Sequence, residues 1–312
     1  MRTTATIAMI VDMHRGPSEL ILTDDSLPSM FRSADSASLA GQADTVRWSA
    51  LQLAMLVIGA VLGGVDIKLS NGLDVGALVA AIALLTSLIP ALWLTANNPQ
   101  RTWYRGRAAA ESLRTLSWKY AMRAEPFAGT DSAAEERLLQ DMAAILRDLG
   151  DIGWPTGAGD SAEITEQMRR LRRQPLRVRQ HAYLEGRLDA EHMWYTAKAR
   201  RFTRIARRWT TVAFIATLLG LAGGFVRAFG LLNYDGLGSA SAIAAAATAW
   251  VQLKQYRPLA AAYSLTSHEL LLVKAGLETL GDDEAQWSRH CSEAEEAISR
   301  EHTMWLARRE AA

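Results

Sequence analysis

Four uncharged, mostly apolar stretches divide the chain, at residues 48–65, 75–96, 209–226 and 237–253. A helix rises about 1.5 Å per residue, so each stretch reaches nearly across the roughly 30 Å hydrocarbon core of a bilayer. Buried helices of soluble bundles contain shorter apolar runs, of about 10–14 residues. The pattern therefore predicts an all-α integral membrane protein with four transmembrane helices, arranged as two tandem helical hairpins. The fourth stretch is the least hydrophobic, because residues 239–249 are mostly alanine with Ser and Thr.

Charged residues beside the four stretches predict their orientation. The loop within the first hairpin holds Asp66, Lys68 and Asp74, and the loop within the second holds Arg227 and Asp235. The outer flanks are basic, with Arg101, Arg105, Arg107, Lys198, Arg200, Arg201, Arg204, Arg207, Arg208, Lys254 and Arg257. Under the positive-inside rule, the central region and both termini face the cytoplasm.

The chain contains an internal repeat. After the second stretch it reads Tyr104-Arg105-x-x-Ala-Ala-Ala-x-Ser-Leu, and after the fourth it reads Tyr256-Arg257-x-x-Ala-Ala-Ala-x-Ser-Leu. The first stretches of the two hairpins also align, for example at Trp48 and Trp209. A duplicated hairpin followed by a cytoplasmic helix explains this self-similarity, with both copies in the same orientation.

The repeat predicts a division of the chain into four parts. Residues 1–26 form an N-terminal segment of unknown role, in which the fragment from Thr6 to Met13 fits a strand or a short helix. Residues 27–150 form the first two-span unit, and residues 151–175 a linker followed by a short charged helix. Residues 176–312 form the second two-span unit, which begins with a helix running without interruption into the third stretch. Long cytoplasmic helices are expected after each hairpin.

Small and polar residues within the predicted spans suggest two roles. Gly59 and Gly63, and likewise Gly220 and Gly224, are four residues apart, a spacing that lets helices approach closely in lipid. That packing could lie within a hairpin or between the subunits of a homo-oligomer. The candidate pore-lining residues are Thr86, Ser87, Pro90, Ser239, Ser241 and Thr248. Ordinary helix packing explains them equally well.

The spans contain no ionisable residue, which argues against a proton relay or a charge-coupled transporter. The functional classes that remain are structural membrane proteins and passive pores. The single cysteine rules out an intrachain disulfide.

Elsewhere the sequence offers no specific chemistry, and we expect no catalytic residue, cofactor or metal. His290 beside Cys291, Glu135 beside Glu136 and Glu295 beside Glu296 are interpreted as solvated positions on helix surfaces. The basic run Arg169–Arg179 is interpreted in the same way, as a solvated helix face near a negatively charged leaflet. Binding of an anionic ligand or of lipid headgroups is the alternative for this run, and no specific nucleic-acid binding is expected.

Several motifs resemble the SLATT family of bacterial two-transmembrane effector domains. Before the first span the chain reads Leu-Pro-Ser-Met-Phe-Arg-Ser-Ala-Asp at 27–35, followed by Ser38-Leu39 and Gln42. After the first hairpin come Trp103-Tyr104-x-x-Arg107-Ala108-x-Ala110-Glu111-Ser112, Trp118-x-Tyr120 and Glu125-Pro126-Phe127. Trp194-Tyr195-x-x-Lys198-Ala199 resembles the start of a second such unit. The second copy keeps Tyr256 and Arg257 but has Tyr263 in place of Glu111, so a role for that glutamate would not transfer.

The resemblance implies an effector of a bacterial defence or conflict system in the inner membrane. Such domains are expected to oligomerise and perforate the membrane, here as a gated pore triggered by a nucleotide signal or a protein partner. The alternative is a membrane scaffold that recruits partners through its cytoplasmic helices without conducting ions.

Overall fold

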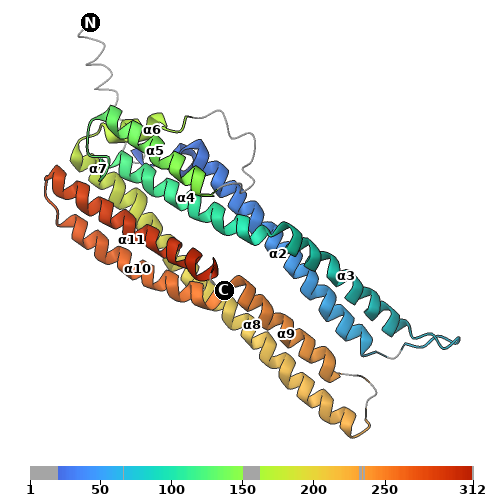
Figure 1. Cartoon of the computed structure of the whole chain (residues 1–312). Helices are drawn as coiled ribbons and strands as arrows, with labels where there is room; N and C mark the ends of the chain where they lie inside the picture. Colours follow the sequence, from blue (N-terminus) through green and yellow to red (C-terminus); the bar gives the residue numbers. More distant parts are fainter. Residues whose placement is uncertain (1–19, 66, 150–161, 232–233, 235, 311–312) are drawn as a thin grey trace. The chain divides into compact units, whose positions relative to one another are not determined.

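The computed structural model describes residues 20–65, 67–149, 162–231, 234 and 236–310, and within them the chain is helical (Figure 1). Its elements are η2 (Asp24–Ser26), α2 (Ser29–Gly63), α3 (Val75–Asn97), α4 (Pro99–Ala121), α5 (Asp131–Leu149), α6 (Glu166–Arg172), α7 (Leu176–Tyr183), the π-helical turn η3 (Leu184–Asp189), α8 (Ala190–Ala228), α9 (Gly236–Lys254), α10 (Tyr256–Glu278) and α11 (Glu284–Glu310). The prediction of an all-α chain is confirmed for this part. The fragment from Thr6 to Met13, the Gly- and Pro-containing part of the linker up to residue 161, Asp66 and Asp235 lie outside the described residues.

Two compact units share these helices, and each takes residues from both sequence repeats. Unit 1 comprises the residues up to 40, residues 102–196 and those from 264 onward; unit 2 comprises residues 41–101 and 197–263. The helices α2, α8 and α10 each contribute one end to each unit. These units do not correspond to the two sequence repeats, because a duplicated segment need not fold as a separate body. The repeat boundaries expected at residues 150 and 176 therefore stay a prediction.

Unit 2 contains the two helical hairpins. The Trp48 and Trp93 rings stack with centroids 4.9 Å apart, and Trp209 lies 6.3 Å from Trp250 in the second hairpin. Each hairpin thus carries one tryptophan pair, formed by its two helices. A residue with positive φ ends each second helix, Asn98 after α3 and Gln255 after α9, and the next helix begins immediately afterwards.

Among the described residues, three helical segments are long and apolar enough to cross a membrane: Ser29–Gly63, Val75–Asn97 and Leu176–Ala228. They cover the first three predicted spans, the first of them up to Gly63. The fourth predicted span corresponds to the alanine-rich α9, which is not among these three. Large apolar side chains of α3 project from the protein, as expected for lipid contact; they are Leu78, Ile82, Leu85, Ile89 and Leu92, with 47–69% of their surface exposed.

Unit 1 is built around α4. The ring of Tyr183 lies between Trp118 and Trp287, with both centroids 5.8 Å away. The indole nitrogen of Trp287 donates a hydrogen bond to the carbonyl of Met122 (3.2 Å). Asp283 caps α11 by accepting from the backbone N–H of Ala285, five residues after α10 ends at Glu278. The first repeat's α4 is thereby packed against the last helix of the second repeat.

Candidate functional site

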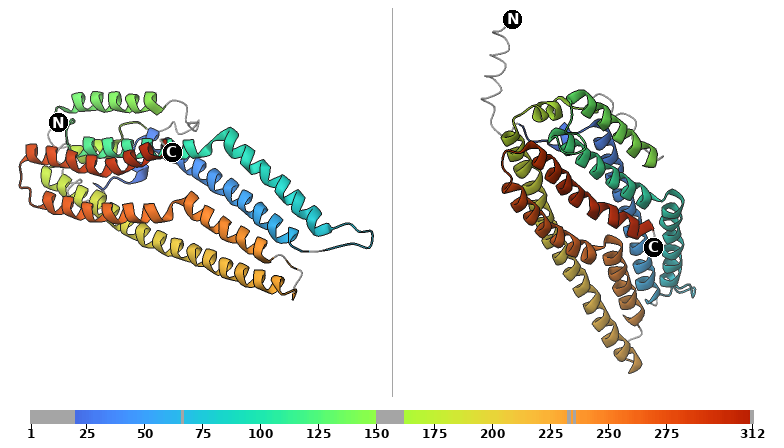
Figure 2. Two further views of the ribbon diagram at one scale, coloured as in Figure 1. Left: turned by 60° about the horizontal axis from the view of Figure 1, so that its bottom comes forward. Right: turned by 60° about the vertical axis from the view of Figure 1, so that its left-hand side comes forward.

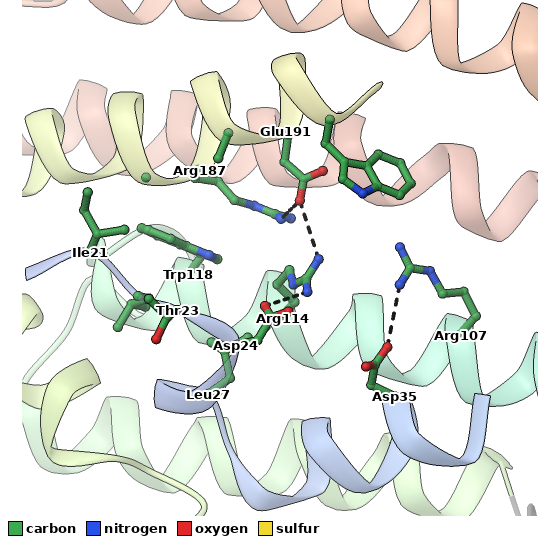
Figure 3. A pocket seen from close by; sticks show the side chains of 14 residues that line it. Ile21, Thr23, Asp24, Leu27, Asp35, Arg107, Arg114, Trp118, Arg187 and Glu191 are labelled. Carbon is green, nitrogen blue, oxygen red and sulfur yellow. Dashed lines mark hydrogen bonds and ion pairs between the residues drawn. The ribbon is translucent and has the colours of Figure 1, made fainter. Parts of the chain in front are cut away.

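A cavity of about 520 Å³ lies within unit 1, between helices of the two sequence repeats. Its lining comes from the segment before α2, from α2 and α4, and from η3 and the start of α8 (Figure 3). The side chains that face it include the apolar Ile21 and Leu27, the aromatic Trp118 and Trp194, and an alternating set of charges: Asp24, Asp35, Arg107, Arg114, Arg187 and Glu191.

These charges belong to a continuous chain of ion pairs that crosses from the first repeat to the second. On α4, Glu111 lies 2.6 Å from Arg107 and 3.4 Å from Arg114. Arg114 continues the chain to Glu191 of α8 (3.6 Å), and Glu191 pairs with Arg187 (2.6 Å). Figure 3 shows Glu191 between the guanidinium groups of Arg187 and Arg114.

The innermost pair of this chain is fully buried. Arg187 donates two hydrogen bonds to Glu295 of α11 (2.9 and 3.0 Å), and the hydroxyl of Tyr183 donates a third (2.9 Å). The side chains of Arg187 and Glu295 are 2% and 0% exposed. A buried ion pair is favourable only when further hydrogen bonds satisfy its charges, and this one meets that condition.

Two sequence interpretations on α11 are therefore wrong. Glu295 is not a solvated surface charge, and Cys291, interpreted as a surface residue, is fully buried. Burial raises the pKa of the Cys291 thiol well above its usual value, which keeps the thiol protonated and unreactive. The signals for the ion chain were the four-residue spacings Arg107–Glu111 and Arg187–Glu191, which place opposite charges on one helix face.

Burial also shifts two carboxyl groups that face the cavity. It raises the pKa of Glu191, although the nearby Arg187 opposes the shift, and it raises the pKa of Asp35 against the effect of Arg107. Five carboxylates, Asp24, Asp35, Glu111, Glu191 and Glu295, share three guanidinium groups in this network.

The raised pKa of Glu191 predicts a pH dependence of stability. Between the unfolded-state value near 4.5 and the higher folded-state value, the folded protein binds more protons, so the free energy of unfolding falls as pH rises through that window. Glu191→Gln removes this titration while keeping the side-chain shape. Thermal unfolding in detergent at pH 5 and pH 7 should show a smaller pH-dependent loss of stability in the variant. Equal losses in the two proteins would contradict the assignment.

Two arginines of the basic run Arg169–Arg179, Arg172 and Arg179, are buried, which corrects the interpretation as a solvated face for these two, whereas Arg173 and Arg177 are exposed. Arg172 is 1% exposed and donates to the carbonyl of Tyr120 (2.8 Å) and to Asp131 (2.9 Å). Arg179 is 3% exposed and donates to the carbonyl of Met122 (2.6 Å) and to Glu284 of α11. These arginines bind the end of α4 to the helices around it.

Arg169 extends this cluster to α5. Its guanidinium donates two hydrogen bonds to Glu135 (2.8 and 3.1 Å), so this glutamate is not merely a solvated charge either. The pair with Arg169 lowers the pKa of Glu135.

The four span glycines lie at contacts within each hairpin. A Cβ atom on Gly59 or Gly63 would meet Ala80 of α3 at 3.4 or 3.3 Å, and one on Gly220 would lie 2.9 Å from the Cβ of Ala240 of α9. Leu237 of α9 lies 3.8 Å from the equivalent position on Gly224. Close packing of each hairpin accounts for these glycines, and a role between subunits remains a prediction.

The candidate pore-lining residues occupy different environments. Ser87, Pro90 and Ser239 are buried, and the hydroxyl of Ser239 donates to the carbonyl of Ala60 in the other hairpin (3.3 Å). Thr86 is half-buried, whereas Ser241 and Thr248 are exposed on α9. The structure therefore places only the last two on an outward face.

The repeat motif residues have different partners in the two copies. Tyr104 is buried and Arg105 half-buried in the first copy. In the second, Tyr256 packs edge-on against Phe202 (5.3 Å) and Arg257 donates to the hydroxyl of Thr210 (2.9 Å).

Tyr263, which stands where the first repeat has Glu111, also packs on Phe202 (5.8 Å). The glutamate's ion pairs are thus replaced by an aromatic contact. Within the part of the chain that the structure describes, no group of three or more His, Cys, Asp or Glu side chains is arranged to hold a metal ion.

Comparison with known protein families divides the chain in two. Residues 28–180 match the family model described as SMODS and SLOG-associating 2TM effector domain 3 (SLATT_3). Residues 183–305 match the model described as SMODS and SLOG-associating 2TM effector domain 1 (SLATT_1). No curated protein and no solved structure matches the chain.

Proposed function

Because the chain belongs to the SLATT family, as two SLATT domains in tandem, we propose that it is a four-span effector of the bacterial inner membrane that assembles as a homo-oligomer and opens a gated pore. Each domain is of a two-transmembrane type, so two domains supply four spans. Both termini would lie in the cytoplasm.

The proposal that α9 is the fourth span is supported by its length and by its pairing with α8. Its 19 residues extend about 28 Å as a helix, and its one charge, Lys254, stands at the end. The Trp209–Trp250 pair mirrors the Trp48–Trp93 pair of the first hairpin, and tryptophans are enriched at membrane interfaces. Exposed arginines precede Trp209 on α8, at 200, 201, 204, 207 and 208, where they favour the cytoplasmic side.

The observation that carries the pore proposal is the exposed face of α9. Its members follow one another at intervals of three and four residues and share one side of the helix: Gly238, Ser241, Ala245, Thr248 and Gln252. None of these five is large and apolar, and Leu237 at the start of α9 is the large apolar side chain exposed beside them, in contrast to the many leucines and isoleucines that α3 exposes. Such a face is better matched to water or to a neighbouring helix than to lipid chains, so an oligomer that turns α9 inward would create a polar lumen.

The cavity in unit 1 is our candidate for the trigger's binding place. Its volume falls within the range of small-molecule sites. A ligand there would contact α4 of the first domain and α8 of the second, and could change how the two are held together.

Cysteine accessibility tests the pore. The native Cys291 is buried, so Ser241→Cys and Thr248→Cys variants would each carry one accessible thiol. We expect induction in bacteria to collapse the membrane potential, measured with a potential-sensitive dye. A charged, water-soluble thiol reagent should block that collapse in both variants by at least half. A matched variant, Leu85→Cys on the lipid-facing side of α3, should be unaffected.

Two outcomes would contradict the proposal. Collapse of the potential that is insensitive to the reagent at positions 241 and 248 would exclude α9 as the lining helix. An intact membrane potential in cells that hold abundant, inserted protein would favour the scaffold alternative. The same result should then hold in inverted membrane vesicles after addition of cytosol from phage-infected cells, which would supply a missing trigger.

A further inference from the structure

The two repeats differ sharply in one helix face of unit 1. The repeat motif aligns Ser112-Leu113 of α4 with Ser264-Leu265 of α10, and both helices continue without a break through the next two turns. It pairs Leu113 with Leu265 and Tyr120 with Leu272. These partners are 0% and 1% exposed in the first repeat but 62% and 74% exposed in the second.

The buried face of α4 is covered by helices of the same chain. The Tyr120 hydroxyl donates to Glu135 of α5 (3.1 Å), and the guanidinium of Arg172 of α6 stacks over the Tyr120 ring (4.8 Å). In the second repeat, the helix equivalent to α5 is α11. Its buried Trp287 and Glu295 contact the end of α4 and Arg187, and its exposed Glu296 accepts a hydrogen bond from Lys119 of α4. The last helix of the second repeat therefore packs against the first repeat, and Leu265 and Leu272 stay exposed.

A second pair of exposed leucines is present on α5. Leu139 and Leu146 are 47% and 42% exposed, while the adjacent face of α5 is buried through Ala134, Leu138 and Met142. Both leucine pairs are spaced by seven residues, the spacing with which helices form an apolar seam. Within unit 1, α5 and α10 lie on opposite sides, with α4 and α11 between them (Figures 1 and 2).

We infer that the exposed face of α10 docks a second copy of this chain through the Leu139–Leu146 face of that copy's α5. The contact would cover Leu265 and Leu272, whose counterparts Leu113 and Tyr120 are buried within the chain. Because the two faces are different and lie on opposite sides of unit 1, the contact is head-to-tail, and its repetition gives a ring where the rotation between neighbours closes and an open row of chains where it does not. The inference rests on the proposed homo-oligomer and names its cytoplasmic interface.

Disulfide cross-linking of the full chain in native membranes tests this contact. The double variant Leu139→Cys/Leu272→Cys should give a ladder of covalent dimers, trimers and larger species under oxidation. Each single variant alone should give none. Co-expression of the two single variants should give covalent dimers and nothing larger, since each pair of chains then has one bond to form.

A non-covalent measurement supports the same test. Leu265→Glu/Leu272→Glu should shift the detergent-solubilised protein from oligomer to monomer by light scattering, with little change in thermal stability because both side chains are exposed. Leu271→Glu, the same substitution on the same helix about 100° away, should leave the oligomer intact.

The outcomes separate the interface from the proposed function. Covalent dimers from Leu272→Cys alone would overturn the head-to-tail contact in favour of a two-fold one. An intact oligomer without any cross-link would place the interface elsewhere and also overturn the inference. A wild-type chain that is monomeric by light scattering would instead remove the homo-oligomer itself.

Discussion

Replacing Glu295 with alanine should cost the folded protein about 3–5 kcal/mol, because it leaves the buried guanidinium of Arg187 without its main partner. Glu295 has no exposed surface and accepts hydrogen bonds from both Arg187 and Tyr183. Glu191, the other carboxylate on Arg187, is shared with Arg114 and does not compensate fully. In a chain of this size the loss corresponds to roughly 6–20 °C in melting temperature, which tryptophan fluorescence in detergent would measure.

Glu293 provides the matched control for this substitution. It lies on the same helix two residues earlier, but its side chain is exposed. Glu293→Ala should change stability by no more than about 0.5 kcal/mol. Equal melting temperatures for the two variants would show that the buried Arg187–Glu295 pair makes no particular contribution to the free energy of unfolding.

Gly106→Ala should destabilise unit 1 by about 1–3 kcal/mol, because α2 and α4 touch backbone to backbone at this residue. A Cβ atom there would lie 2.9 Å from both the carbonyl oxygen of Ala34 and the backbone nitrogen of Ser38. Backbone atoms cannot rotate aside as a side chain would, so one helix must move. The hydrogen bond from the Ser38 hydroxyl to the carbonyl of Trp103 (3.0 Å) would be strained by the same movement.

The same substitution at Gly276 should act in the opposite direction. Gly276 lies within α10, and nothing lies within 4 Å of a Cβ atom placed on it. Alanine has a higher helix propensity than glycine by up to about 1 kcal/mol, so Gly276→Ala should stabilise the protein slightly. Thermal unfolding of the two variants side by side would check both signs. A loss of stability at both positions would mean that the close approach at Gly106 is not the cause.

Hydrophobic periodicity predicted much of this fold from local sequence. The long apolar stretches and the repeat motif at Tyr104 and Tyr256 depend on residues close together in the chain. Such features are set by the helix period and by local backbone conformation.

The candidate site could not be predicted in the same way. Glu295 looked like a solvated charge because nothing near it in sequence indicates that Arg187, 108 residues earlier, lies against it. Arg172 and Arg179 likewise appeared as part of a charged surface run, although their partners are backbone carbonyls at the end of α4. Burial of a charge depends on which helices meet, and helix periodicity alone does not determine that.

The packing of α11 on α4 has a consequence for synthesis of the protein. The carbonyl of Met122 and the indole of Trp287 are 165 residues apart in the chain. At a translation rate of about 5–20 residues per second, Trp287 of α11 is synthesised roughly 8–33 s after the C-terminal end of α4 against which it packs. Until then the ribosome carries a chain whose first hairpin can already enter the membrane while the helices of unit 1 remain unpacked. A nascent chain of this design completes unit 1 only when nearly all of it has been translated.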